Sequence, residues 1–271
     1  MGRIGRSIEL VRQSYRILMQ DKELMILPLV SGVFIAGVVV AVVLGFGISS
    51  DDISRRDPRA AVAAFLMYVV IYAIGIFFQA AVIAGATERM RGGDPTVASA
   101  LRAAAKRLGP IMLWAVFAAT VGVILRVIHD RAGFVGKIIV SIVGAAWSLA
   151  TFFVVPVLVL EERSVGASFS QSVAVFKKTW GETMAGGMSI GVVAFAAWVT
   201  LIAVVGLLAW AGAGLVVAMA VGIVGAVTLV VFFSALQGIY VASLYRYATE
   251  GHAPSGFDGD LLAHAFVPKT R

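Results

Sequence analysis

The sequence predicts an all-α, polytopic membrane protein with six transmembrane helices in three hairpins, each preceded by a cytoplasmic amphipathic helix. Hydrophobic residues make up 60% of the 271 residues and charged residues 14%, whereas soluble domains have about 45–50% and about 25%. Six apolar runs are each long enough to cross a hydrocarbon core about 30 Å thick. Lys and Arg collect at alternate ends of these runs. Together these three observations predict a protein that threads back and forth through a bilayer.

The apolar runs define the expected spans. We place transmembrane helices at residues 26–48, 60–87, 110–128, 137–160, 183–210 and 215–242, the last extending as a helix toward Thr249. The first run is longer than the apolar part of a secretory signal and has no small-residue cleavage site after it. It therefore predicts a retained anchor.

The distribution of positive charge predicts the orientation. Of the 22 Lys and Arg residues, 16 lie in the N-terminal segment, the segments after the second and fourth spans, and the C-terminal end, and 6 lie at the opposite ends of the spans. Short loops rich in Lys and Arg stay in the cytoplasm. We therefore expect a multi-pass protein of the cell inner (plasma) membrane with both termini cytoplasmic.

This orientation pairs the spans into three hairpins within a single membrane domain of residues 1–271. The hairpins are expected at residues 26–87, 110–160 and 183–249, with a cytoplasmic tail at 250–271. Segments 3–25, 95–108 and 164–181 precede them and repeat apolar residues at helical spacing, which predicts helices lying along the membrane surface or packed under the bundle.

Each of these segments has an expected apolar stripe and two have an expected start. The stripes are Ile4, Ile8, Val11, Tyr15 and Leu18; Val97, Leu101, Ala105 and Leu108; and Val165, Phe169, Val173, Phe176 and Trp180. The pair Asp94-Pro95 is expected to begin the second helix, and Ser164 to cap the third.

A glutamate ends each hairpin. Glu88, Glu161 and Glu250 occupy equivalent places in a threefold pseudo-repeat with a spacing of 73 residues between the first two. We expect them to pair with Arg89, Arg163 or Arg246, or to mark the end of the apolar run; a cation or headgroup site is the alternative. Tyr245 and Tyr247 fit an aromatic belt at the same level.

Three stretches carry a family resemblance: "VVPVLVLEERSVGASFSQSVAVFKKTW", "IYVASLYRYATEG" and "GFDGDLLAHAFVPK". They resemble uncharacterised six-span prokaryotic integral membrane proteins that are similar to the membrane domain fused to some glycerophosphoryl diester phosphodiesterases. The resemblance implies the fold and not the activity, since the phosphodiesterase chemistry of the fused proteins belongs to a separate soluble domain. It carries over no catalytic residue.

The composition argues against several classes of function. There is no cysteine, which excludes disulfides and thiol chemistry, and the three His residues are not spaced as metal ligands. The pair His129-Asp130 is expected to be a solvated part of an outer loop. No basic cluster is interleaved with aromatic residues, so nucleic acid is not an expected partner. We predict no enzyme activity, no cofactor, and no catalytic or metal site.

The polar residues within the spans are all neutral, which disfavours proton-coupled transport. For most of them we expect interhelical hydrogen bonds, and small-residue ridges at Gly37-Ala41-Gly45, Gly187-Gly191 and Ala218-Gly222-Ala226 predict close helix packing within the bundle or between subunits. A candidate polar cavity is formed by Gln79, Gln237, Tyr72, Tyr240 and Ser234.

Two functions follow from these patterns. The first is a non-enzymatic protein that organises or contacts lipids or partner proteins at the cytoplasmic leaflet, with membrane lipids as partners and a protein partner or homo-oligomer as a further candidate. Its lipid-headgroup contacts are expected at Arg102, Lys106, Arg107, Lys177 and Lys178. The alternative is a transporter or channel for a neutral or amphipathic solute, using the candidate polar cavity.

Overall fold

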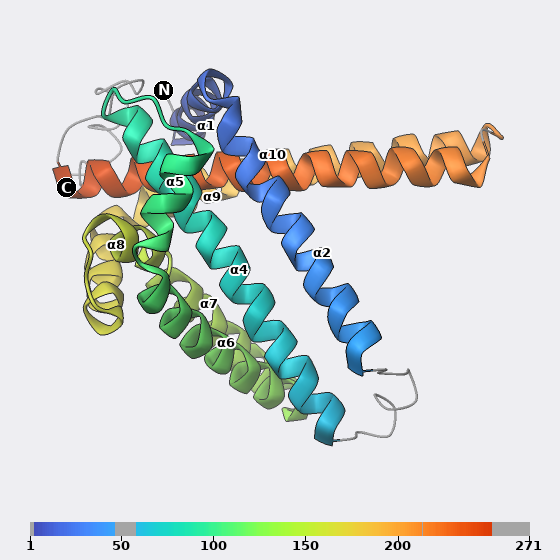
Figure 1. Cartoon of the computed structure of the whole chain (residues 1–271), viewed down its shortest axis with the longest axis horizontal. Helices are drawn as coiled ribbons and strands as arrows, with labels where there is room; N and C mark the ends of the chain where they lie inside the picture. The colour runs from blue at the N-terminus through green and yellow to red at the C-terminus, as the bar shows by residue number, and fades with distance from the viewer. Residues whose placement is uncertain (1–2, 47–57, 213, 251–271) are drawn as a thin grey trace. The chain divides into compact units, whose positions relative to one another are not determined.

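The computed structural model describes residues 3–46, 58–212 and 214–250, and the side-chain surroundings of these residues except 3–10, 46, 58–61, 179–188 and 247. All regular secondary structure in this part of the chain is helical (Figure 1). The elements are α1 (Arg3–Gln20), the 3-10 helix η1 (Lys22–Met25), α2 (Ile26–Phe46), α4 (Pro58–Met90), α5 (Val97–Ala105), α6 (Leu108–Arg131), α7 (Phe134–Ala150), α8 (Val154–Leu160), α9 (Val165–Trp210) and α10 (Leu215–Glu250).

Six stretches of the described residues are long and apolar enough to cross a membrane, which confirms the number of spans that the sequence predicts. They are Lys22–Gly45, Val62–Met90, Leu108–Arg131, Phe134–Leu160, Ser189–Trp210 and Leu215–Glu250. The predicted tail at 251–271, with His252 and His264, and much of the first outer connection lie outside the described residues.

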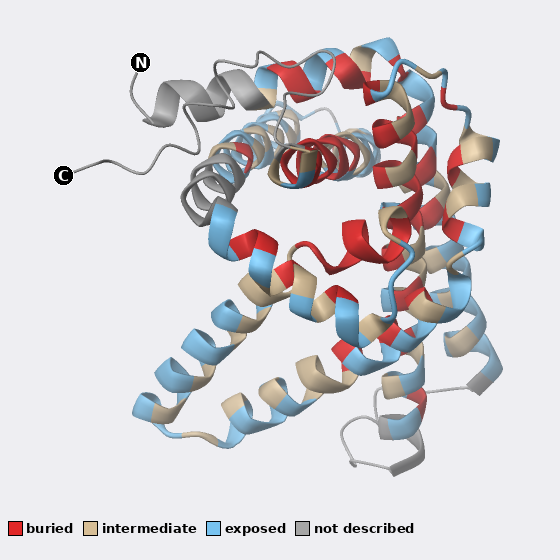
Figure 2. Cartoon of the chain, turned by 90° about the vertical axis from the view of Figure 1, so that its left-hand side faces the viewer, coloured by how far each residue is buried: buried red, intermediate tan, exposed pale blue. Residues whose placement is uncertain are grey.

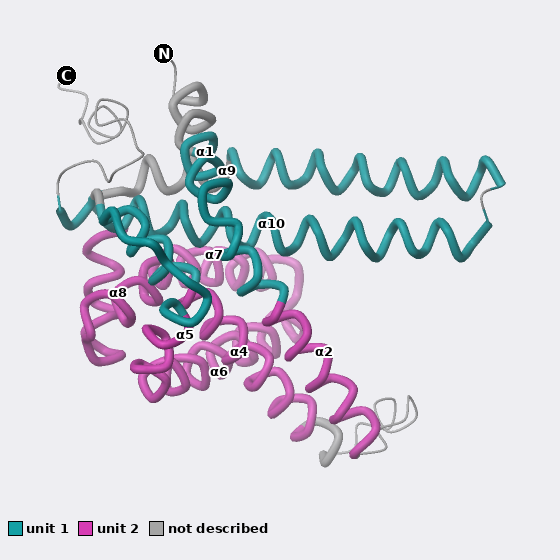
Figure 3. Tube along the Cα trace, turned by 45° about the horizontal axis from the view of Figure 1, so that its top comes forward, with its two compact units in different colours: residues 1–29, 82–100, 177–271 teal, residues 30–81, 101–176 magenta. Residues whose placement is uncertain are grey.

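The described residues divide into two compact units, although the sequence predicts one membrane domain (Figure 3). Unit 1 takes its residues from Met1–Leu29, Val82–Ala100 and Lys177–Arg271, and unit 2 from Val30–Ala81 and Leu101–Phe176. Each unit therefore joins segments that are far apart in the sequence, and each is described by itself.

Unit 1 is held together where the C-terminal part of α10 packs against α1 and η1. Several side chains at this contact are fully buried, among them Leu18, Leu24 and Tyr240. Buried residues are red in Figure 2. Two glycines allow the close approach of α4 to its neighbours. A Cβ at Gly85 would lie 2.7 Å from Leu24, and one at Gly238 would lie 2.5 Å from Val82. These helices can approach this closely only because both positions lack a side chain.

The N-terminal half of α10 packs along α9, and the two helices run side by side in Figure 3. The predicted ridge of small residues forms this contact: Ala218 is buried, and a Cβ at Gly222 would lie 3.4 Å from Val205. This ridge therefore packs against another helix of the same chain, which is one of the two expected outcomes. The turn between the helices uses Gly212 and Gly214 with φ angles of 76° and 85°, which an L side chain rarely adopts.

The boundaries of two predicted amphipathic segments are wrong. The segment expected at 3–25 is interrupted, because α1 ends at Gln20 and Asp21 has non-helical angles (φ −122°, ψ 71°) before η1. The segment expected at 164–181 does not end before the next span, since α9 runs without a break from Val165 to Trp210. A continuous helix pairs its own backbone groups, whereas a break needs capping partners.

The fourth predicted span, 137–160, is two helices. α7 ends at Ala150, a turn follows, and α8 begins at Val154. Pro156 is the sequence signal for this break, because it offers no N–H to the carbonyl of Phe152 four residues earlier. Residues 153–159 are all buried, so the non-helical turn adjoins a segment enclosed by protein.

Candidate functional site

The turn after α4 orients a group of charged side chains in unit 1. The N–H of Gly93 donates to the carbonyl of Glu88 at 3.0 Å, and the N–H of Gly92 donates to that of Arg89 at 2.9 Å. With Gly92 at φ 84°, this is a Schellman motif. It turns the chain back on itself directly after α4, and so places Asp94 beside Arg89.

The start of α5 differs from the expected Asp94-Pro95 pair. Thr96 is the N-cap: its Oγ1 accepts a hydrogen bond from the N–H of Ser99 at 3.0 Å, and Ser99 Oγ accepts one from the N–H of Thr96 at 3.0 Å. This reciprocal arrangement is a capping box with Ser99 in the third helical position. Asp94 is therefore free of the capping role and pairs with an arginine instead. Ser164 does precede α9, and its carbonyl accepts from the N–H of Ser168 at 2.8 Å.

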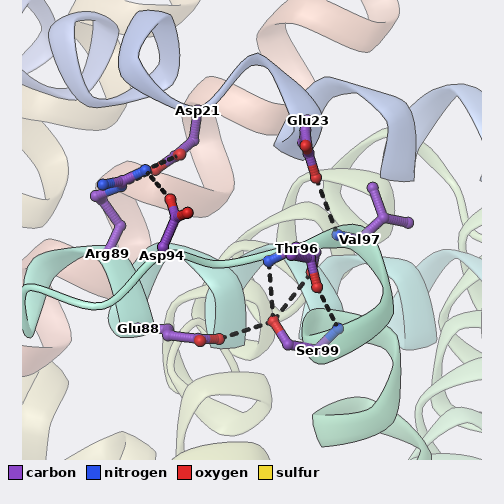
Figure 4. Close-up of polar contacts among 8 residues, drawn as sticks. All are labelled: Asp21, Glu23, Glu88, Arg89, Asp94, Thr96, Val97 and Ser99. Carbon is purple, nitrogen blue, oxygen red and sulfur yellow. Dashed lines mark hydrogen bonds and ion pairs between the residues drawn. The ribbon is translucent and has the colours of Figure 1, made fainter.

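Arg89 is the centre of an ion-pair network. Its Nε and Nη2 donate to the two carboxylate oxygens of Asp21, and Nη2 also donates to Asp94 at 2.8 Å (Figure 4). The Asp21 side chain is 7% exposed and that of Arg89 27% exposed. A two-point arginine–carboxylate contact fixes both direction and distance. It therefore ties the junction of α1 and η1 to the C-terminal end of α4.

Two glutamates reach the N-terminus of α5. Glu88 accepts a hydrogen bond from Ser99 Oγ at 2.9 Å, and Glu23 accepts one from the N–H of Val97 at 3.4 Å (Figure 4). Negative charge at a helix N-terminus is favourable, because the unpaired N–H groups point there. We call Asp21, Glu23, Glu88, Arg89, Asp94, Thr96 and Ser99 the α4–α5 polar cluster.

The three glutamates that end the predicted hairpins have different partners. Glu161 lies 2.5 Å from Arg163, and Glu250 lies 2.6 Å from Arg246, as expected. Glu88 does not pair with Arg89, which is engaged with Asp21 and Asp94. Glu88 lies at the end of the apolar run of α4, which is the other expected outcome. Tyr245 is also not in an aromatic belt, since its side chain is buried inside unit 1; the side chain of Tyr247 lies outside the described residues.

In unit 2, Ser172 closes the break between α7 and α8. Its Oγ donates to the carbonyl of Ala150 at 2.6 Å and accepts from the N–H of Phe153 at 3.0 Å. One buried hydroxyl thus satisfies a carbonyl at the end of α7 and an N–H at the start of α8. The sequence alone does not reveal this role of Ser172, because a serine on an amphipathic helix carries no local sign of a partner about 20 residues away.

Arg107, a predicted headgroup contact, caps the other end of α8. Its Nε donates to the carbonyl of Leu158 at 3.0 Å and its Nη2 to that of Arg163 at 2.7 Å. A cation at a helix C-terminus is favourable, since unpaired carbonyls collect there. The other four predicted headgroup contacts, Arg102, Lys106, Lys177 and Lys178, are exposed.

The three predicted apolar stripes are not the buried faces of their helices. Residues next to the stripes are buried instead, most of them small or polar: Gln13, Ser14 and the apolar Ile17 in α1, Ala100 and Ala104 in α5, and Ser168, Ser172 and the apolar Val175 in α9. Most described stripe residues are half-buried or exposed, with Leu18 and Phe176 as buried exceptions; Ile4, Ile8 and Trp180 lie outside the described side chains. Small residues permit close backbone approach, which leaves the larger apolar side chains at the margin.

The five residues of the candidate polar cavity are distributed over both units. Tyr72 and Gln79 belong to unit 2, and Ser234, Gln237 and Tyr240 to unit 1. Within α10, Tyr240 is fully buried, whereas Ser234 and Gln237 are exposed. In unit 2, Tyr72 stacks on Tyr68 with ring centroids 5.9 Å apart. The transporter alternative stays a prediction.

The prediction that the neutral span residues form interhelical hydrogen bonds is wrong for five hydroxyls. Each donates to the carbonyl four residues earlier in its own helix: Thr120 to Val116, Ser148 to Gly144, Thr151 to Trp147, Thr200 to Ala196 and Thr228 to Val224. A hydroxyl on a helix in apolar surroundings has this acceptor within reach wherever its neighbours lie. These residues therefore carry no information on helix pairing.

The pair His129-Asp130 lies in the last turn of α6 and not in a loop. His129 Nδ1 is 3.7 Å from Asp130, whose other oxygen is 4.0 Å from Arg126, and these side chains are open to solvent. Among the described residues, no group of three His, Cys, Asp or Glu is arranged to hold a metal ion.

Comparison of the sequence with known proteins finds a matching protein family. Residues 59–257 match the model described as "Family of unknown function (DUF6159)", which covers well over half of the 271 residues. No curated protein and no solved structure matches the chain.

Proposed function

The chain belongs to the DUF6159 family, and we propose that it is a non-enzymatic integral membrane protein that contacts and organises lipids, or partner proteins, at the cytoplasmic leaflet. In this proposal the six apolar helices cross the cell inner membrane as three hairpins, with both termini cytoplasmic. The family match adds no link to phosphodiesterase-fused proteins, so that resemblance remains a proposal about fold alone.

The single observation that carries the proposal is the open apolar margin of α1, α5 and the start of α9. In each, larger apolar residues such as Tyr15, Leu101 and Phe169 are left at least partly accessible, although Leu18 and Phe176 are buried. Exposed apolar side chains of this kind gain about 25 cal/mol per Å² when a bilayer covers them. They support helices that lie in the membrane interface.

Basic residues adjoin these open margins. Arg12 and Arg16 on α1, Arg102 and Lys106 around the end of α5, and the pair 177–178 on α9 are all exposed. Each cation near an anionic leaflet contributes on the order of 1 kcal/mol of attraction. The combination of apolar side chains and flanking cations favours an anionic lipid surface over a neutral one.

The test replaces Arg102, Lys106, Lys177 and Lys178 together by alanine in the full-length chain. Reconstituted in nanodiscs of phosphatidylcholine and phosphatidylglycerol, the wild-type protein should order the neighbouring anionic lipids, measured with a spin-labelled phosphatidylglycerol. The four-site variant should lose most of this preference while keeping its helix content. Raising the salt concentration should weaken the wild-type effect, because exposed charges are screened.

The matched control replaces Arg126, Arg131 and Lys137, which are equally exposed residues at the opposite ends of α6 and α7. This variant should behave like the wild type if the cytoplasmic side alone contacts anionic lipid in this way. Equal loss in both variants, or no loss in either, would exclude the proposed site of lipid contact.

A further inference from the structure

Arg246 is a charged side chain within the C-terminal part of α10, and its side chain is only 8% exposed. Its Nε donates to Glu250 at 3.1 Å and its Nη2 donates to the second oxygen of Glu250 at 2.6 Å. Its Nη1 is buried and has no hydrogen-bond partner. A guanidinium has five N–H donors, and a buried donor on a charged group is costly to leave unpaired. The geometry therefore provides no acceptor for Nη1.

Arg91 approaches the same carboxylate from the turn after α4. Its Nη2 lies 3.8 Å from Glu250, at a distance that adds attraction without a hydrogen bond. The side chains of Arg91, Glu250 and Arg246 are 62%, 26% and 8% exposed. They form a series from the surface inward, with two positive charges and one negative charge. An anion arriving at this surface meets Arg91 first, and Glu250 lies between Arg91 and Arg246.

The interior of unit 1 contains other buried polar side chains. α1 packs against α10 and contributes two buried polar side chains, Gln13 and Ser14, and α10 itself buries Ser243 and Tyr240. All of these residues belong to unit 1. Arginine is suited to such a position, because its planar fork matches the oxygens of a phosphate group and remains charged when buried.

We propose that Arg246 and Arg91 form a binding site for a phosphate group, supplied by an anionic phospholipid headgroup or by free phosphate. A phosphate oxygen accepts a hydrogen bond from Nη1 of Arg246, a second oxygen pairs with Arg91, and Glu250 is the carboxylate that the ligand displaces. The inference rests on the proposed function, since that function puts the ends of α4 and α10 at the level of the cytoplasmic headgroups.

The experiment measures phosphatidylglycerol bound to the purified full-length protein, by native mass spectrometry after titration of the lipid into neutral detergent. Arg246→Gln should weaken binding by about tenfold or more, the effect of losing one charge-assisted hydrogen bond. Arg246→Lys should weaken it as well, because an ammonium is a point charge and lacks the planar fork that matches phosphate oxygens. Arg126→Gln, at an exposed arginine with its own carboxylate four residues later, is the matched control and should change nothing.

Glu250→Gln keeps the test informative if the Arg246 variants fold poorly. It removes the competing carboxylate and should strengthen phosphatidylglycerol binding, a gain that misfolding does not produce. A parallel titration with inorganic phosphate separates the two sources: displacement of the lipid at low millimolar phosphate assigns the site to free phosphate, and retention assigns it to the headgroup.

The inference is overturned if phosphatidylglycerol binding is unchanged in Arg246→Gln and does not rise in Glu250→Gln. The proposed function is judged separately, by the four-site alanine variant in nanodiscs. Loss of lipid ordering in that variant together with unchanged binding in both α10 variants would refute this site and leave the proposed function standing. Normal ordering in the four-site variant with weaker binding in Arg246→Gln would do the reverse.

Discussion

Replacing Arg89 by alanine should destabilise the protein more than any single change at its exposed charges. Arg89 binds Asp21 through two donors and Asp94 through a third hydrogen bond. The Asp21 side chain is only 7% exposed in the wild type, and the Arg89→Ala substitution removes the arginine partner of this buried carboxylate. The opposite change, Asp21→Ala, should cost less, because Arg89 keeps Asp94 as a partner.

The magnitude follows from burial. Removing one partner of a buried ion pair costs about 3–5 kcal/mol, and the partial exposure of Arg89 lowers this to about 2–3 kcal/mol, since water screens the pair. Asp94 lies almost fully in solvent, so its bond contributes little. We therefore expect a coupling energy of about 2 kcal/mol between Arg89 and Asp21.

A double-mutant cycle measures this coupling directly. The free energy of unfolding of the wild type, the two single alanine variants and the double variant is obtained by titration with sodium dodecyl sulfate in mixed micelles, followed by tryptophan fluorescence. The exposed pair Arg126 and Asp130, four residues apart and 4.0 Å from each other, is the control and should couple by about 0.5 kcal/mol or less. A coupling at Arg89 and Asp21 no larger than the control would refute the reasoning.

Three further substitutions, two of them paired with a control substitution, test other contacts in the same unfolding assay. Ser172→Ala removes both hydrogen bonds across the break between α7 and α8 and should cost about 2 kcal/mol, whereas Ser168→Ala, at a buried hydroxyl without a partner, should cost little; equal losses would contradict the bridging role. Gly238→Ala should cost about 1–3 kcal/mol because its Cβ meets a buried, stiff valine, while Gly37→Ala on α2, with open space around it, should be neutral. Arg107→Ala should cost about 1–2 kcal/mol and speed amide exchange at the end of α8; unchanged exchange there would argue against capping.

Local patterns in the sequence predicted much of this protein. The six spans follow from hydropathy, because a helix long and apolar enough to cross a bilayer is recognisable from its own residues. The ion pairs of Glu250 with Arg246 and of Glu161 with Arg163 were expected for the same reason, since the partners are close in sequence. The ridge of small residues on α10 correctly indicated close packing.

Contacts between distant residues had no such signal. Arg89 and Asp21 are 68 positions apart, and the sequence around either residue does not indicate that the other is its partner. Ser172 likewise lies on α9, and only the tertiary structure shows that its hydroxyl bridges the break between α7 and α8. The hydroxyls of the spans show the opposite case: their polarity predicted interhelical hydrogen bonds, but they donate to carbonyls of their own helices.

The buried faces of the amphipathic helices show most clearly which features the sequence determines and which depend on tertiary structure. Apolar spacing alone predicted that α1, α5 and the start of α9 are helical, which the structure confirms. Which side of each helix turns inward was decided by tertiary packing, because close approach of backbones selects Ser14, Ala100 or Ser172 over larger neighbours. Hydropathy measures how strongly a residue avoids water, and it does not report whether protein or lipid covers that residue.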